Sequence, residues 1–175
     1  MGRFAIINKW KLSKKQKPKL IFFDLDGTLV DGFEYIYQHL WEYFGVEREQ
    51  TRDVLKSYLR GEITYEQWVD NDVRLLKKAG ATRTRILEAI KSLKPMNGAI
   101  DVLRQLRDKN YKIIVVSGSM NLVIEAVFPN DMNLFDEIFI NQYFFDKEGM
   151  ITHAVPTRYD MEQKATCITD TAKKI

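Results

Sequence analysis

The chain has 175 residues, of which 45% are hydrophobic and 29% charged, a composition that excludes a wholly disordered protein. No apolar run approaches the roughly 18 residues of a membrane span or the apolar core of a secretory signal, so we expect no membrane span and a cytoplasmic location. The net charge of +3 originates in the first 19 residues, which carry seven basic residues and no acid. Because the rest of the chain has 20 basic and 24 acidic residues, we expect no nucleic-acid partner.

Two short apolar runs, each followed by acidic or small polar residues, are typical of strands buried on both faces of a parallel sheet. They are LIFF at residues 20–23, before Asp24, and KIIVV at residues 112–116, before a polar loop that begins at Ser117. About 80 residues lie between the two runs, whereas a parallel crossover needs only about a dozen. An insertion is therefore expected, and the apolar spacing predicts the crossover helix itself within 97–111.

The segment 32–94 has the pattern of four amphipathic helices with short breaks at glycine or threonine, which predicts a small all-helical cap domain. The rest of the chain predicts a helix, a strand, a hairpin and a final helix, at residues 121–128, 136–141, 142–155 and 160–175. We therefore expect an α/β fold in three parts, which are a basic arm at 1–19, a core at 20–31 and 95–175, and the helical cap at 32–94.

Two acids follow the first predicted strand, in the sequence DLDGT. Side chains two residues apart on a strand point the same way, so Asp24 and Asp26 both reach beyond the carboxyl end of the sheet, where open α/β folds bind ligands. Gly27 allows a tight turn, and the Thr28 hydroxyl can hold that turn by a hydrogen bond. Two carboxylates this close favour a divalent cation, which predicts metal and phosphate chemistry. The alternative is that they are ordinary turn or helix-capping acids.

Three segments together resemble the motifs of the haloacid dehalogenase superfamily. They are DLDGT after LIFF, VVSGS at 115–119, and Lys164 in EQKA at the start of the last predicted helix. The helical insertion and the stretch from Phe135 onwards are similar to the phosphoserine-phosphatase branch. The resemblance implies a Rossmann-like three-layer α/β core with a parallel sheet and a small all-α cap. It also implies a phosphatase or phosphomutase, because the dehalogenase branch lacks the second acid at Asp26.

The resemblance implies a role for each motif residue. Asp24 is implied as the nucleophile that forms an aspartyl phosphate, and Asp26 as the acid and base for the leaving group and the hydrolytic water. The residues implied to bind the phosphate are Thr28, Ser117, Gly118 and Lys164. Mg²⁺ is implied at an Asp24 carboxylate oxygen and the Asp26 main-chain carbonyl. The implied function is magnesium-dependent hydrolysis of a small phosphorylated metabolite.

The cap residues expected to contact the substrate depart from the phosphoserine-phosphatase pattern. The nearest glutamate, Glu34, comes one position later than the pattern requires, and Asp72 takes the place of the arginine that binds the substrate carboxylate. An acid there repels a carboxylate, which argues against phosphoserine and for a cationic or neutral phosphorylated metabolite. The alternative for Asp72 is a solvated acid on a helix surface.

The fourth motif of the superfamily, an acidic loop that supplies further metal ligands, does not occur before Ile175. This predicts that the chain is a fragment of a longer phosphatase and that its own activity is impaired. The alternative, from a different class, is a non-catalytic relative that acts in binding or regulation. Magnesium-dependent hydrolysis of a generic phosphate ester distinguishes the two.

Overall fold

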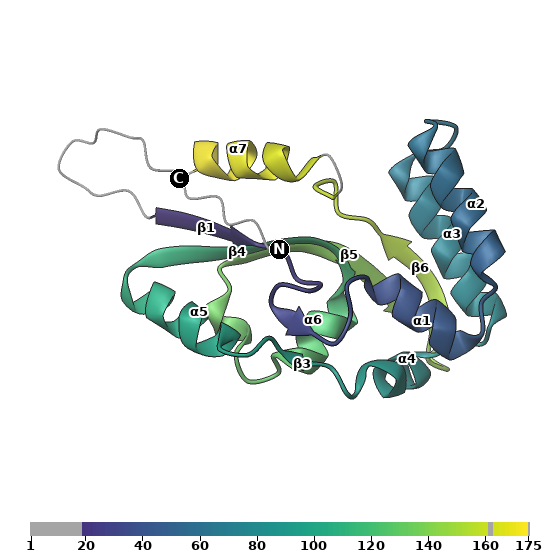
Figure 1. Ribbon diagram of the computed structural model, residues 1–175, viewed down its shortest axis with the longest axis horizontal. Helices are drawn as coiled ribbons and strands as arrows, with labels where there is room; N and C mark the ends of the chain where they lie inside the picture. Colours follow the sequence, from purple (N-terminus) through teal and green to yellow (C-terminus); the bar gives the residue numbers. More distant parts are fainter. Residues whose placement is uncertain (1–18, 161–162, 175) are drawn as a thin grey trace.

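The computed structural model describes residues 19–160 and 163–174, which form an α/β fold (Figure 1). The main sheet contains, in spatial order, β1 (Lys19–Phe23), β4 (Tyr111–Met120), β5 (Glu137–Phe145) and β6 (Ile151–Val155). The first three strands run parallel, and β6 is antiparallel to β5. Of the predicted basic arm, residues 1–18 lie outside the described residues, and Lys19 is the first residue of β1.

Helices cover both faces of the sheet, as the predicted three layers require (Figure 1). The helices of the core are α5 (Ala99–Asp108), α6 (Asn121–Val127), the 3₁₀ helix η1 (Met132–Leu134) and α7 (Lys164–Lys174). α5 and α6 pack on one face, and α7 lies over the other. Ile113 and Val115 of β4 belong to the larger core, whereas Ile114 and Val116 join a second core with Cys167 of α7. Burial on both faces explains the continuous apolar run of this strand.

Four helices lie between β2 (Val30–Asp31) and β3 (Lys94–Pro95), two short strands that pair antiparallel and join the ends of the insertion. These helices, called the inserted helices below, are α1 (Ile36–Phe44), α2 (Arg48–Leu59), α3 (Tyr65–Lys78) and α4 (Arg83–Ile90). They match the four predicted amphipathic segments. α3 packs against β6, so the insertion contacts the core sheet (Figure 1). None of the helices in the described part of the chain is long and apolar enough to cross a membrane.

The structure corrects two strand predictions. β4 continues through Ser117 to Met120, where the sequence suggests a polar loop. Its register with β5 shifts between Val116 and Met120, so the polar residues form an irregularity inside the strand. β5 is continuous because it pairs with β4 along its first half and with β6 along its second. The third strand and the first arm of the hairpin, predicted as separate elements, are therefore one strand.

α3 begins with a capping box, in which the Thr64 hydroxyl accepts a hydrogen bond from the Gln67 amide and the Gln67 side chain accepts one from the Thr64 amide. We expect Thr64→Ala to lower the free energy of unfolding by about 1 kcal/mol, because a main-chain donor loses its partner. Urea denaturation measures this change. Thr84→Ala, at an exposed position of α4, is the control and should change stability by less than about 0.5 kcal/mol. Equal losses in the two variants would contradict the prediction.

Candidate active site

The end of β1 and the start of α7 meet at Asp24 and Lys164. Lys164 Nζ donates a hydrogen bond to Asp24 Oδ2 at 2.5 Å, and the Leu25 amide donates one to Asp24 Oδ1 at 2.8 Å. The side chains of Asp24 and Lys164 are 41% and 37% exposed, so a solute can reach both. Two residues predicted from separate motifs are therefore in direct contact.

Asp26 is more deeply placed than Asp24 and anchors the start of the inserted helices. Its Oδ2 accepts a hydrogen bond from the Ile36 amide, the first of α1, at 3.0 Å. Its Oδ1 is buried with no regular hydrogen bond, and the same holds for the nearby Ser119 hydroxyl. Burial raises the pKa of Asp26 to about 6, against smaller opposing effects of Ser119 and the Ile36 amide. This carboxyl therefore holds a proton closer to neutral pH than an ordinary aspartate does.

The turn after Asp26 is held by the main chain. Gly27 has φ of 64°, a left-handed conformation that glycine adopts without strain. The amides of Thr28, Leu29 and Val30 all donate to the Leu25 carbonyl, at 3.0 to 3.2 Å. The Thr28 hydroxyl makes no hydrogen bond to the described residues, so the expectation that it holds the turn is wrong.

Ser117 and Gly118 lie beside Asp24, because β1 and β4 are paired in parallel with Phe23 opposite Val115. Ser117 is 2% exposed, and its hydroxyl accepts a hydrogen bond from the Ser119 amide at 3.3 Å. Gly118 is in close contact with Asp160, since a Cβ atom at residue 118 would lie 2.0 Å from Asp160 Oδ2. A carboxylate therefore occupies the space directly next to this glycine.

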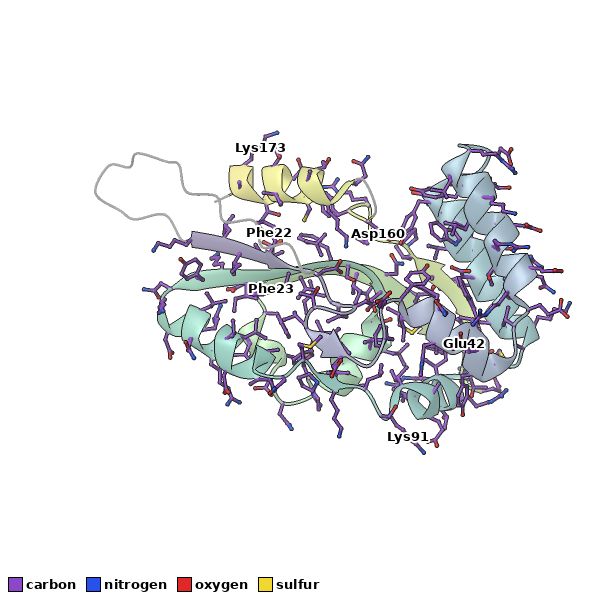
Figure 2. The ribbon with its side chains drawn as sticks, viewed as in Figure 1. Phe22, Phe23, Glu42, Lys91, Asp160 and Lys173 are labelled. Atoms are coloured by element: carbon purple, nitrogen blue, oxygen red, sulfur yellow. The ribbon has the colours of Figure 1, made fainter. Side chains whose placement is uncertain are left out.

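A hydrogen-bonded network joins the inserted helices to the core above Gly118, and its members are Tyr37, Tyr65, Asn141, Tyr143 and Asp160. Asn141 Nδ2 donates to the Tyr65 hydroxyl at 2.9 Å and to the Gly118 carbonyl at 2.8 Å. The Tyr65 hydroxyl donates to Asp160 Oδ2 at 2.6 Å, and the Tyr143 hydroxyl donates to that of Tyr37 at 2.9 Å. Figure 2 labels Asp160, in the loop after β6.

The sequence did not point to these five residues. Tyr37 and Tyr65 lie within amphipathic patterns that only predict burial, and Asn141 and Tyr143 lie inside a strand pattern. The position of Asp160, four residues before Lys164, is the one signal that places a network residue near a motif.

The two predicted cap residues have different surroundings. Glu34 is exposed and makes no hydrogen bond or ion pair with the described residues. Asp72 is 2% exposed, and its Oδ1 is buried without a hydrogen-bond partner among the described residues. Burial raises its pKa to about 8. The alternative of a solvated helix acid is therefore wrong for Asp72.

The acids at the end of β1 provide hard oxygen donors of the kind that Mg²⁺ binds. Within the described residues, no group of three or more His, Cys, Asp or Glu side chains could hold a metal ion. Asp24 and Asp26 are thus a partial ligand set, which suits an ion that keeps several water ligands and also binds a substrate phosphate. Asp24 and Asp26 therefore fit such an ion only when water and the substrate phosphate supply its other ligands.

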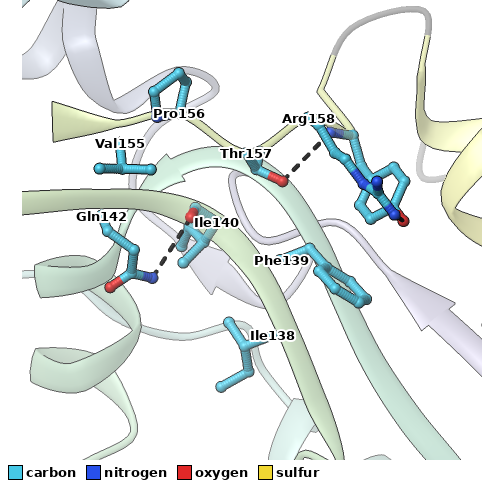
Figure 3. A pocket seen from close by; sticks show the side chains of 9 residues that line it. Ile138, Phe139, Ile140, Gln142, Val155, Pro156, Thr157 and Arg158 are labelled. Atoms are coloured by element: carbon cyan, nitrogen blue, oxygen red, sulfur yellow. Dashed lines mark hydrogen bonds between the residues drawn. The ribbon is translucent and has the colours of Figure 1, made fainter.

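A pocket of about 280 Å³ lies elsewhere, between β5 and the loop after β6 (Figure 3). Its lining includes Ile138, Phe139, Val155 and Arg158, and it contains none of the predicted site residues. We therefore take the motif residues, and not this pocket, as the candidate active site.

Comparisons with known proteins identify the fold and the family of this chain. Solved structures of phosphoserine phosphatase share the fold. A substrate-bound complex is 27% identical with a TM-score of 0.66, covering 91% of this chain and 72% of that one. A phospho-aspartyl intermediate analogue is 28% identical with a TM-score of 0.63, covering 90% of this chain and 72% of that one.

The family model of the haloacid dehalogenase-like hydrolases matches residues 18–169, and the chain belongs to this family. The phosphoserine phosphatase of Methanocaldococcus jannaschii is 32% identical over 79% of this chain and 62% of its own length. That of Archaeoglobus fulgidus is 29% identical over 99% of this chain and 48% of its own length. The chain thus spans less than two thirds of either curated relative.

Burial of Asp72 makes stability depend on pH. Its pKa is about 8 in the folded protein against the ordinary value of 3.8, so between these values the folded state holds a proton that the unfolded state releases. The free energy of unfolding should therefore fall by about 1 kcal/mol for each pH unit from pH 6 to 8, above the pKa of Asp26, and Asp72→Asn should lose the dependence in this window. Urea denaturation at several pH values measures it, with Asp70→Asn, exposed on the same helix, as control. Parallel profiles for Asp72→Asn and the wild type would refute the prediction.

The contact between Gly118 and Asp160 predicts a coupled pair. In Gly118→Ala the new methyl group displaces Asp160 from Tyr65, which should lower the free energy of unfolding by about 1 to 2 kcal/mol. In an Asp160→Ala background the same substitution should cost less than about 0.5 kcal/mol, because the clash is gone. A double-mutant cycle by urea denaturation tests this, and additive effects would show that the contact is unimportant.

Proposed function

We propose that this chain carries the reaction centre of a magnesium-dependent phosphomonoester phosphatase that works through an aspartyl phosphate on Asp24. The observation that carries the proposal is the contact between Asp24 and Lys164 at the carboxyl end of β1. A similar solved structure supports it, because that structure is a phospho-aspartyl intermediate analogue of phosphoserine phosphatase. In this proposal the inserted helices form the cap over the site.

In the proposed reaction an Asp24 carboxylate oxygen attacks phosphorus, and the bond from phosphorus to the leaving oxygen breaks. Asp26 protonates that oxygen, a role suited to a carboxyl whose pKa burial raises to about 6. Asp26 then takes a proton from the water that hydrolyses the aspartyl phosphate. Splitting the displacement into two steps lowers the barrier of each.

The remaining motif residues stabilise the transferring phosphoryl group. Lys164, next to the Asp24 carboxylate, offsets the negative charge of the phosphoryl group. The Ser117 hydroxyl, the Gly118 amide and Thr28, in the turn after Asp26, are proposed to bind the oxygens of this group. When bound by the Asp24 carboxylate and the Asp26 carbonyl, Mg²⁺ supplies further charge compensation.

A second function, phosphate-ester binding without turnover, is favoured by one observation. Asp160 lies against Gly118, where a phosphate oxygen would bind. A substrate phosphate has to displace this carboxylate, and a chain in which Asp160 stays in place would not turn over.

Asp24→Asn should lower magnesium-dependent hydrolysis of p-nitrophenyl phosphate by about 1,000-fold or more, because an amide is a very weak nucleophile. Removing Mg²⁺ with EDTA should have a similar effect on the wild-type chain. Asp31→Asn, at an exposed position of β2, is the matched control and should keep its rate. A wild-type rate no higher than that of Asp24→Asn, both in this chain and in one extended beyond Ile175, would support the non-catalytic function instead.

A further inference from the structure

Asp72 is a buried acid that no group in the described chain neutralises. It is 2% exposed, its Oδ1 has no partner, and no described residue donates a hydrogen bond to its carboxyl group. Arg74, the nearest cation on α3, is exposed and bonds to Asn71 instead. An unpaired buried carboxyl group is costly, and its retention favours a partner beyond the residues that the structure describes.

The surroundings of Asp72 are aromatic and acidic. Burial raises the pKa of the Tyr35, Tyr65 and Tyr143 hydroxyls, and the Asp72 carboxyl raises each of them further, so all three lie within its electrostatic reach. Asp160 acts on Tyr35 and Tyr65 in the same direction. Because the two side chains that act on this cluster, Asp72 and Asp160, are both acidic, the cluster favours a cation and disfavours an anion.

Aromatic rings line the same face of α3. Tyr65, Trp68 and Asp72 follow one another at helical spacing of three and four residues. The rings of Tyr65 and Trp68 meet edge to face with centroids 6.1 Å apart, and the Trp68 Nε1 is also buried without a partner. Aromatic faces beside a carboxylate are the usual environment for protonated or quaternary amines in proteins.

This cluster is connected to the proposed phosphate site by direct contacts. Tyr65 bonds to Asp160, and Asp160 lies against Gly118. Tyr35, which is 36% exposed, is the member of the cluster that solvent reaches most. A phosphate ester with its phosphoryl group at Gly118 would therefore extend its leaving group toward Tyr65 and Asp72.

We propose that Asp72, with the aromatic side chains of Tyr35, Tyr65 and Trp68, binds a cationic amino group on the leaving group of the substrate. The substrate class is then the phosphate monoester of an amino alcohol that lacks a carboxylate. This inference rests on the proposed function, because it concerns the leaving group of that reaction. A cation next to Asp72 favours the ionised form of its carboxyl group. In this buried position, the ionised form is stable only while the cation is bound.

Four phosphate esters test separately the effects of an amino group and of a carboxylate on the leaving group. Phosphoethanolamine has an amine alone, phosphoserine an amine and a carboxylate, 3-phosphoglycerate a carboxylate alone, and glycerol 1-phosphate neither. Binding is measured by isothermal titration calorimetry to Asp24→Asn, which cannot turn the esters over. We expect phosphoethanolamine to bind at least about tenfold more tightly than glycerol 1-phosphate, and the carboxylate to weaken binding in both pairs.

The decisive variant adds Asp72→Asn to Asp24→Asn and keeps the shape of the side chain. It should remove most of the preference for phosphoethanolamine while leaving glycerol 1-phosphate binding within about twofold. Asp70→Asn in the same background is the control and should keep the preference. Equal binding of the amine and neutral esters, an unchanged preference in Asp72→Asn, or no measurable binding of phosphoethanolamine would overturn the inference. Failure of the proposed function is read separately, from hydrolysis of p-nitrophenyl phosphate that does not depend on Asp24.

Discussion

The parallel pairing of β1 with β4 is the constraint on which the candidate site depends. It places the end of β1, before Asp24, beside the part of β4 that leads into Ser117. The ion pair with Lys164 then ties the start of α7 to the same edge of the sheet. Residues that are 140 positions apart in the chain thus share one site at the carboxyl end of β1.

The inserted helices are held over this edge by both apolar and polar contacts. Buried apolar residues of α1, α3 and α4 belong to the same large core as residues of β5 and β6. Tyr65 on α3 bonds to Asp160, and Tyr37 on α1 bonds to the Gly118 carbonyl. Asp26 adds a third polar link by accepting the first amide of α1. Such bonds contribute only modest net stability each, because water offers equivalent partners when they break, so the polar contacts mainly fix where the helices sit.

The burial of the Asp26 and Asp72 carboxyl groups lowers the stability of the folded protein. Each has a raised pKa and an oxygen without a hydrogen-bond partner. In the proposed reaction the two acids face different parts of the substrate, with Asp26 at the reacting centre and Asp72 near the leaving group. Unpaired buried polar groups are rare in folded proteins, and two of them in one chain are more typical of function than of folding.

The sequence alone determined the two apolar strands β1 and β4 and the four inserted helices, because apolar runs and helical spacing are local properties of the chain. The resemblance to known motifs singled out Asp24 and Lys164, and the structure showed that they are in contact. The sequence placed Asp72 on a helix but left its burial open, since the partner surface on β6 lies some 80 residues further on. Only the tertiary structure decided the tyrosine network, the place of Asp160 against Gly118 and the continuation of β4 through Ser117. Each depends on contacts between distant segments, which no local pattern encodes.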